Sequence, residues 1–195
     1  WESRNTLQGS ELFGKYLLLV GFGRIGREVG KRALAFGMQL HVYDPYVDEQ
    51  QVGSAGAAYV KVLDTFLPKT DFLSLHLPYT PKNHHIIGHE ELRALPSSAY
   101  VINTARGGLI DENELFKALE SGNLAGAGLD CFEQEPPSKN LKLLTSGKVI
   151  VSPHNASLTA ECTRRLGLVC VENVVDALTG CLKKERVVNW DAVHA

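Results

Sequence analysis

Three glycines follow the G-x-G-x-x-G spacing where a short apolar run gives way to a helical pattern: Gly21, Gly23 and Gly26. The first glycine permits a tight turn, the second lets a pyrophosphate approach the backbone, and the third lets the helix pack closely on the strand. Unpaired N–H groups and the dipole at the helix N-terminus attract phosphates. The spacing therefore predicts a dinucleotide site, and a glycine turn required for steric reasons alone is the structural alternative.

An acidic residue stands where the ribose of such a dinucleotide would lie. Asp44 ends the second predicted strand, beyond the helix that Gly26 opens. A carboxylate at this place accepts hydrogen bonds from both ribose hydroxyls and repels a 2′-phosphate. The residue type therefore favours NAD over NADP.

Three neighbouring histidines raise the question of a metal site. His85 and His89 are separated by one helical turn, and His84 precedes them. However, no cysteine or carboxylate is evidently placed to complete a tetrahedral site. We therefore expect a polar loop here and no metal.

Short apolar runs and helical patterns alternate along the chain and must position these residues. The first strand is predicted at 16–20, and a helix follows it until Gly37. Asp111 can cap a later helix with Glu114 three residues on, and Gly122 ends it. Further strands are predicted at 40–43, 72–77, 100–103, 125–129 and 149–151. Further helices are predicted at 48–54, 62–67 and 159–178.

This alternation predicts an α/β fold. We expect a doubly wound, mostly parallel sheet of the Rossmann type, with helices on both faces. In such sheets, ligands bind beyond the carboxyl ends of the strands. The glycine turn and Asp44 both lie at those ends.

Composition and charge exclude several classes of protein. A chain of 195 residues is the size of one domain, and its 44% apolar content is sufficient for a core. The net charge of −2 lacks the basic excess of a nucleic-acid coat protein. The longest run without polar side chains, at 16–23, is much shorter than the ~20 residues of a membrane span. A membrane protein and a disordered tail are therefore excluded as well.

The cysteine pattern predicts free thiols. No C-x-x-C pair occurs among Cys131, Cys162, Cys170 and Cys181. We therefore expect a reducing, cytoplasmic compartment and a fold that no signal peptide precedes. Cys131 is expected to be a small buried filler and not a nucleophile. Because Met38 is the sole methionine, we expect Trp1 not to be the natural start and the chain to be a fragment.

Three motifs in order carry a family resemblance: Gly14–Pro45, Asn103-Thr104-Ala105-Arg106-Gly107-Gly108, and Ser152-Pro153-His154. Over essentially its whole length, the chain resembles the NAD-binding domain of the D-isomer-specific 2-hydroxyacid dehydrogenases. Within that family it most resembles the phosphoglycerate dehydrogenase and hydroxypyruvate reductase branch.

The resemblance implies three catalytic residues. Arg106 matches the arginine that holds the substrate carboxylate, a role suited to its planar, permanently charged fork. His154 matches the catalytic acid/base, and Glu135 matches the carboxylate that pairs with this histidine. Taken singly, these residues would be a surface ion pair, a structural histidine and a solvated loop acid. Glu133 is the alternative to Glu135, which we choose because it directly precedes the prolines.

The resemblance also implies contacts with NAD. Asp130 matches the acid that receives the nicotinamide carboxamide, and His76 and Pro78 match the loop along the adenosine side. The whole set expected to contact the cofactor is Gly21, Gly23, Arg24, Ile25, Gly26, Asp44, His76, Pro78, Thr104, Ala105, Arg106, Asp130, His154 and Ala156. Ordinary strand-end capping and packing are the structural alternatives.

The implied reaction is hydride transfer between nicotinamide and C2 of a D-2-hydroxy acid or 2-oxo acid, similar to phosphoglycerate or hydroxypyruvate. In this reaction His154 takes or gives the hydroxyl proton. Formate dehydrogenases of the superfamily carry glutamine where Glu135 stands, so the glutamate argues against formate.

Two other functions remain open. The corepressors of the C-terminal-binding-protein type share this fold, the NAD site and the catalytic set, and the segment 83–87 is similar to theirs. They carry tryptophan three residues after the histidine, where this chain has Ser157. A cofactor-binding module without activity of its own is the third alternative.

The resemblance implies that residues 1–195 are one NAD-binding domain and that a separate substrate domain lies outside this chain. By analogy with the family, we expect the full-length parent to be a homodimer. Its expected ligand is a small 2-hydroxy or 2-oxo acid, and neither nucleic acid nor a membrane is an expected partner.

Overall fold

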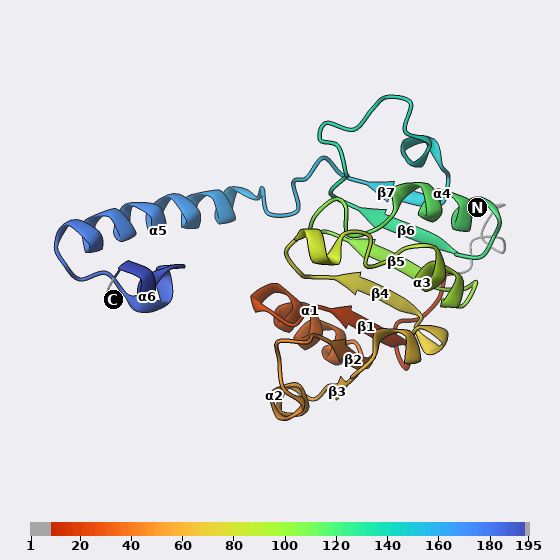
Figure 1. Cartoon of the computed structure of the whole chain (residues 1–195), viewed down its shortest axis with the longest axis horizontal. Helices are drawn as coiled ribbons and strands as arrows, with labels where there is room; N and C mark the ends of the chain where they lie inside the picture. Colours follow the sequence, from red (N-terminus) through yellow and green to blue (C-terminus); the bar gives the residue numbers. More distant parts are fainter. Residues whose placement is uncertain (1–8, 194–195) are drawn as a thin grey trace. The chain divides into compact units, whose positions relative to one another are not determined.

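A computed structural model of the chain describes residues 9–193. The chain divides into two compact units between His154 and Asn155, and each unit is considered by itself. Figure 1 shows that the first unit is built around a single twisted sheet.

The sheet confirms the predicted fold class. Its seven strands are β1 (Tyr16–Val20), β2 (Gln39–Tyr43), β3 (Ala58–Tyr59), β4 (Phe72–Leu75), β5 (Tyr100–Asn103), β6 (Gly126–Leu129) and β7 (Val149–Val151). Their order is β3-β2-β1-β4-β5-β6-β7, and every pairing is parallel. The order reverses between β1 and β4, and such a switch point is where ligands bind in open α/β sheets.

Helices cover the sheet, as Figure 1 shows. The α-helices of the first unit are α1 (Arg24–Ala35), α2 (Glu49–Ser54), α3 (His89–Ala94) and α4 (Glu112–Glu120). Its 3-10 helices are η2 (Leu63–Thr65), η3 (Leu67–Lys69), η4 (Pro81–Asn83) and η5 (Lys142–Thr145). As predicted, Asp111 caps α4, and its Oδ1 accepts hydrogen bonds from the backbone N–H groups of Asn113 and Glu114.

Four predictions of local structure were wrong or incomplete. The helix expected at 62–67 is a pair of 3-10 turns, because Pro68 disfavours the α conformation in the residue before it. The strand expected at 72–77 ends at Leu75, because its partner β1 ends where Gly21 turns away. The expected polar loop at His89 is instead the start of α3. The two-residue strand β3 was not predicted, because it is too short for a periodic signal.

Alternate residues of β1 face two apolar clusters, one on each side of the sheet. Leu18 is fully buried in a cluster with Leu92 of α3 and Leu115 of α4. Leu19 is fully buried in a second cluster, which includes Ala33 of α1. A strand buried on both faces accounts for its unbroken apolar sequence.

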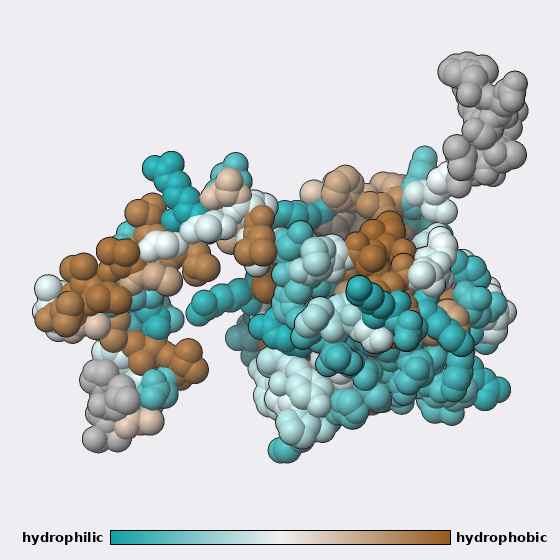
Figure 2. All heavy atoms as spheres, turned by 90° about the horizontal axis from the view of Figure 1, so that it is seen from above, coloured by the Kyte–Doolittle hydropathy of each residue, from teal (hydrophilic) through white to brown (hydrophobic). Residues whose placement is uncertain are grey.

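The second unit contains the long helix α5 (Ala160–Leu178), the 3-10 helix η6 (Lys184–Arg186) and the short helix α6 (Trp190–Val193). The Thr159 side chain caps α5, which agrees with the predicted helix start. The Arg186 guanidinium donates to Asn173 Oδ1 at 2.9 Å and pairs with Asp176 at 3.6 Å, so η6 is held on α5. No residue of α5 is buried within the described part of the chain, and Figure 2 shows apolar side chains along this segment.

No helix among residues 9–193 is long and apolar enough to cross a membrane.

Candidate active site

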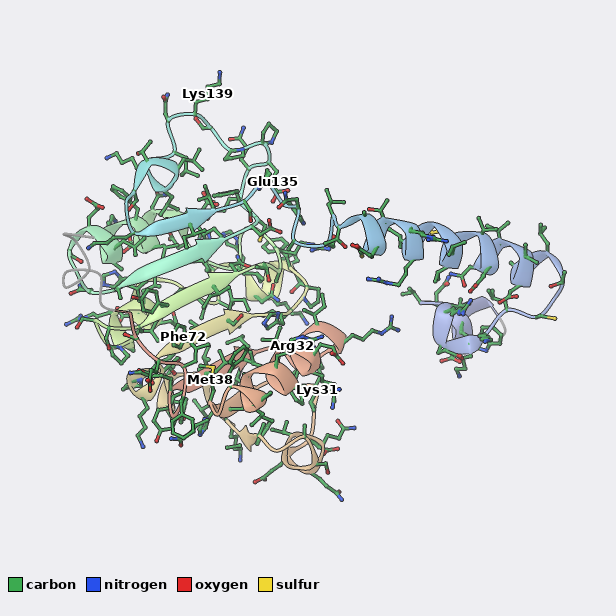
Figure 3. All side chains as sticks on the ribbon, turned by 180° about the vertical axis from the view of Figure 1, so that it is seen from behind. Lys31, Arg32, Met38, Phe72, Glu135 and Lys139 are labelled. Atoms are coloured by element: carbon green, nitrogen blue, oxygen red, sulfur yellow. The ribbon has the colours of Figure 1, made fainter. Side chains whose placement is uncertain are left out.

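The predicted site residues of the first unit follow the carboxyl ends of the strands. Because all the strands are parallel, these ends meet at one edge of the sheet. Figure 3 labels Glu135 in a loop at this edge. The sheet thereby gathers residues that are far apart in the sequence.

The glycine turn after β1 is required by packing. Gly21 has a φ of 100°, which favours glycine, and a Cβ there would lie 2.7 Å from the carbonyl carbon of His76. A Cβ at Gly26 would collide with the carbonyl oxygen of Gly21. By contrast, apart from Gly23 and its two chain neighbours, no heavy atom lies within 4 Å of the place where a Cβ of Gly23 would stand. Gly23 is also the N-cap of α1, so the start of this helix has no capping side chain.

Besides its predicted role at the ribose, Asp44 accepts two backbone hydrogen bonds that were not predicted from the sequence. Its Oδ2 accepts a hydrogen bond from the backbone N–H of Phe22 at 2.7 Å, within the glycine turn. Its Oδ1 accepts one from the backbone N–H of Tyr46 at 2.9 Å. Asp44 therefore also ties the end of β2 to the glycine turn.

Two further residues of the predicted cofactor set, Arg24 and Ile25, are exposed in the first turn of α1.

The segment after β4 packs against this turn. The Nε2 atom of His76 lies 2.9 Å from Ser74 Oγ. Burial lowers the pKa of His76 to about 4, so the imidazole is neutral at pH 7. Pro78 is exposed, and its carbonyl accepts a hydrogen bond from the Asn83 side chain at 2.7 Å.

A buried amide shapes the turn that carries Arg106. The Asn103 side chain accepts from the backbone N–H of Ala105 at 3.0 Å and donates to the carbonyl of Arg106 at 2.8 Å. The guanidinium of Arg106 is exposed and donates to the carbonyl of Ala105 at 2.6 Å. Thr104, which lies between Asn103 and Ala105 in the sequence, is also exposed. Sequence reasoning missed the part played by Asn103, although an amide that ends a strand before a turn was the available signal.

Glu135 and His154 lie together. His154 Nδ1 is 2.7 Å from Glu135 Oε2, and the other oxygen of Glu135 accepts from the backbone N–H of Phe132 at 3.0 Å. The hydrogen bond from His154, followed by the one from Phe132, lowers the pKa of Glu135, and the charge of Arg106 acts in the same direction. The carboxylate favours a proton on Nδ1, which leaves Nε2 as the nitrogen that can exchange a proton with a substrate.

A side-chain hydrogen bond joins the ends of β6 and β7. Asp130 is 3% exposed, and its Oδ1 accepts from Ser152 Oγ at 2.6 Å. Ser152 therefore anchors the segment that leads to His154. Sequence reasoning did not assign it a role, although it opens the Ser152-Pro153-His154 motif.

An open cavity of about 390 Å³ adjoins the Glu135–His154 pair. Apart from the pair and Ser152, its lining is apolar: Phe132, Pro136, Pro137, Leu144, Val151 and Pro153. Electrostatic interactions are stronger beside such a surface than in bulk water.

The alternative residues have other contacts. Glu133 Oε1 lies 2.9 Å from His85 Nε2, not beside His154. Burial raises the pKa of Cys131 to about 12, which keeps this thiol protonated at neutral pH. Within residues 9–193, no three His, Cys, Asp or Glu side chains are grouped so as to hold a metal ion. Ala156, the remaining residue of the predicted set, belongs to the second unit.

Comparison with known proteins gives consistent results. Residues 1–156 match the family model described as D-isomer specific 2-hydroxyacid dehydrogenase, NAD binding domain. The chain is 43% identical over 189 residues to the D-3-phosphoglycerate dehydrogenase of Methanocaldococcus jannaschii, which covers 97% of this chain and 36% of that protein. It is 45% identical over 180 residues to the hydroxypyruvate reductase of Thermotoga maritima, which covers 91% of this chain and 57% of that protein.

A solved structure of similar fold is a D-isomer specific 2-hydroxyacid dehydrogenase from Lactobacillus delbrueckii ssp. bulgaricus in its NAD-complexed form. Its TM-score is 0.83 at 30% sequence identity, over 92% of this chain and 58% of that chain. The chain thus spans between about a third and three fifths of the length of these relatives. By sequence and by fold, the chain belongs to the NAD-binding domain family of the D-isomer-specific 2-hydroxyacid dehydrogenases.

Proposed function

We propose that this chain is the NAD-binding domain of an NAD-dependent oxidoreductase that transfers a hydride between nicotinamide and C2 of a D-2-hydroxy acid or 2-oxo acid. The observation that carries the proposal is the contact of 2.7 Å between His154 Nδ1 and Glu135, at the same sheet edge as the glycine turn and Arg106. This edge combines a nucleotide-type turn with an acid/base pair and a cation, as the reaction requires.

Each side chain has a distinct task. His154 takes the hydroxyl proton during oxidation and returns it during reduction, through Nε2. Glu135 holds the imidazole in one tautomer and stabilises the imidazolium that forms. Arg106 binds the substrate carboxylate with its planar fork and thereby orients C2.

The residues at the glycine turn fit NAD. A pyrophosphate fits beside Gly23, where a Cβ would meet no atom outside its own segment, and at the start of α1, which has no capping side chain. The Asp44 carboxylate fits a ribose without a 2′-phosphate. NAD, when bound, supplies the nicotinamide that accepts or donates the hydride. The family match supports the same cofactor.

The names of the relatives favour an enzyme over the corepressor alternative, because they are a dehydrogenase and a reductase. We propose a substrate similar to phosphoglycerate or hydroxypyruvate on the same basis. A separate substrate domain would supply the second wall of the cleft, which agrees with the 36% and 57% of these relatives that the chain covers. We also propose a homodimer, by analogy with the family, and a cytoplasmic location, because the four cysteines are free.

The test is a panel of 2-oxo acids, phosphohydroxypyruvate, hydroxypyruvate and glyoxylate among them, with NADH and the full-length parent. We expect oxidation of NADH with at least one of them and a much lower rate with NADPH. Binding of NADH without turnover of any 2-oxo acid would contradict the oxidoreductase and favour the corepressor alternative. Sedimentation of the same sample tests the homodimer.

A further inference from the structure

We propose that His85 is a positioning residue for the Glu135–His154 pair, because it ties the loop that carries Glu135 to the start of α4. The inference rests on the proposed function, since it adds a supporting residue to the proposed catalytic pair. His85 lies outside that pair and acts on it through Glu133.

The imidazole of His85 lies between two carboxylates on different segments. Its Nε2 is 2.9 Å from Glu133 Oε1, in the loop after β6, and its Nδ1 is 3.5 Å from Asp111 Oδ2, at the cap of α4. The side chain is 29% exposed, and its ring stacks on that of His84 with 3.7 Å between centroids. His85 therefore joins the loop after β6 to the start of α4 at a partly enclosed place.

The same two segments exchange hydrogen bonds with each other. The backbone N–H of Glu133 donates to Glu112 Oε1 at 2.6 Å, and the backbone N–H of Glu112 lies 3.4 Å from Glu133 Oε1. Burial raises the pKa of Glu112, and the neighbouring charge of Glu133 adds to this rise, whereas that of His85 opposes it. The carboxyl groups of Asp111, Glu112 and Glu133 thus lie close to one another, and the imidazole of His85 contacts two of them.

The short loop transmits this anchoring to Glu135. Phe132 precedes Glu133, and its backbone N–H donates to Glu135 Oε1 at 3.0 Å. On the other side, the backbone of Phe132 packs so tightly against Gly107 that a Cβ at Gly107 would collide with the Phe132 carbonyl. Because Glu133 is fixed between these contacts, Glu135 is held where it reaches His154.

Backbone conformation supports a role for the His85 side chain. Among residues 9–193, the two non-glycine residues with positive φ are His85, at 51°, and His154, at 50°. This conformation favours glycine, and a larger residue persists there only when its surroundings hold it. The backbone N–H of His85 donates to the carbonyl of Gly108 at 2.8 Å, so the strained segment is itself fixed to the Arg106 turn.

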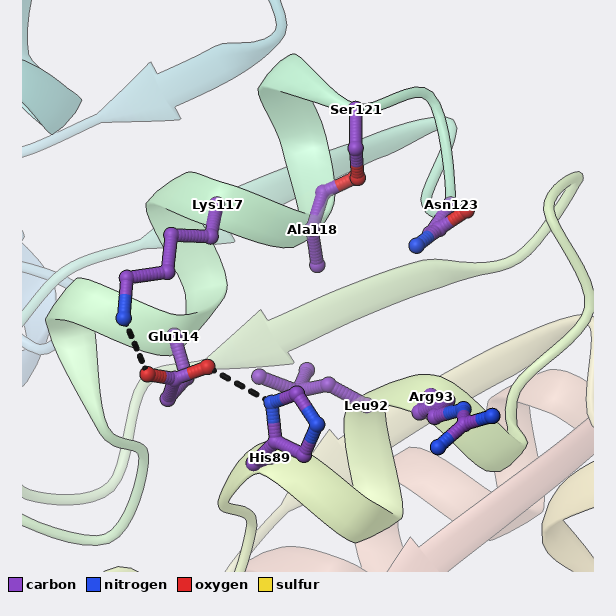
Figure 4. A pocket seen from close by; sticks show the side chains of 8 residues that line it. All are labelled: His89, Leu92, Arg93, Glu114, Lys117, Ala118, Ser121 and Asn123. Carbon is purple, nitrogen blue, oxygen red and sulfur yellow. Dashed lines mark hydrogen bonds and ion pairs between the residues drawn. The ribbon is translucent and has the colours of Figure 1, made fainter.

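The chain offers a matched control in His89. Its Nδ1 lies 2.8 Å from Glu114 Oε2, so it also pairs with a carboxylate of α4, at a pocket between α3 and α4 (Figure 4). Neither this pair nor Lys117, which also binds Glu114, contacts Glu133 in the structure. Removal of His89 therefore takes away a histidine–carboxylate pair without releasing the loop.

The first experiment titrates the Glu135 carboxyl by ¹³C NMR in the full 195-residue chain. In His85→Ala we expect its pKa to rise by about half a pH unit or more, because the hydrogen bonds that lower it are no longer held in place. His85→Gln keeps an N–H donor for Glu133, and His89→Ala spares the loop, so both are expected to leave the pKa of Glu135 unchanged. If His85→Ala does not fold, Glu133→Ala removes the same contact from the other side and should give the same rise.

The second experiment measures kinetics in the full-length parent. We expect His85→Ala to lower kcat roughly tenfold while the KM for NADH stays the same, and His85→Gln to restore kcat. An unchanged pKa of Glu135 in His85→Ala, or an equal rise in His89→Ala, would overturn the inference. These titrations need no turnover, so a parent that reduces no 2-oxo acid would refute the proposed function while the titration still decides the role of His85.

Discussion

At the scale of single residues, the Glu135–His154 contact links proton chemistry to a measurable acidity. Removal of the imidazole in His154→Ala deletes the hydrogen bond that contributes most to the low pKa of Glu135. We therefore expect the pKa of Glu135 to rise toward its ordinary value, and kcat of the full-length parent to fall roughly 10²–10⁴-fold, the usual contribution of general acid–base catalysis. Carboxyl NMR and steady-state rates check the two effects.

The pH dependence of this pair has a defined sign. Because the pKa of Glu135 is lower in the folded chain, its ionised form and the contact with His154 are present above the ordinary pKa of a glutamate. The contact is lost as the pH falls through the lowered pKa of Glu135.

Near-normal turnover by His154→Ala at neutral pH would remove this histidine from the proposed mechanism.

Asp44 has two tasks that substitutions can separate. Asp44→Ala removes the acceptor for the Phe22 N–H as well as the charge, so it should lower both NADH affinity and thermal stability. Asp44→Asn keeps an acceptor oxygen but not the charge. It should therefore retain more of the stability and yet narrow the preference for NADH over NADPH, as measured by calorimetry. An unchanged preference in both variants would contradict the placement of the ribose at Asp44.

At the scale of elements, two glycines at the junction between β1 and α1 should differ in how much an alanine substitution lowers the stability of the chain. Gly26→Ala places a Cβ against the carbonyl of Gly21 and should lower the free energy of unfolding by about 1–3 kcal/mol. In Gly23→Ala the new Cβ meets no heavy atom within 4 Å beyond its chain neighbours, so the free energy of unfolding should fall only by about 0.5–1 kcal/mol, the cost of alanine at an N-cap.

The same substitutions should differ in cofactor binding. Gly23→Ala puts a methyl group where the pyrophosphate is expected, so NADH affinity should fall about tenfold or more, which is roughly 1.4 kcal/mol. Denaturant unfolding and calorimetry on both variants check the pair. Tight NADH binding by Gly23→Ala would show that the phosphates lie elsewhere.

At the scale of the whole molecule, cofactor binding should stabilise the folded chain by mass action. NADH at a free concentration of about 100 Kd should raise the free energy of unfolding by about 2.7 kcal/mol, because it binds the folded state alone. Thermal unfolding with and without NADH measures this. NADPH at the same concentration is the control, and it should stabilise less because Asp44 repels its 2′-phosphate. Equal stabilisation by both would contradict the selectivity.

Local chemistry made much of the molecule predictable. The glycine turn, the cap at Asp111, the start of the last long helix near Thr159 and the apolar run of β1 depend on neighbouring residues, so periodicity and residue type locate them in advance. The parallel sheet follows from the alternation of such elements, and it places the predicted site residues at one edge of the sheet. The short elements β3 and α3 were missed because a few residues carry too little pattern to separate a strand or a helix from a loop.

Contacts between distant segments required the folded chain. The position before the prolines favoured Glu135 over Glu133 as the partner of His154, but nothing in the sequence indicated that Glu133 would contact His85. In the same way, His85 and His89 have helical spacing, yet α3 begins at His89 and leaves His85 on the preceding segment in a left-handed conformation. Side-chain partners across long loops depend on packing and not on local periodicity, and for that physical reason the contacts of His85 with Glu133 and Asp111 came only from the tertiary structure.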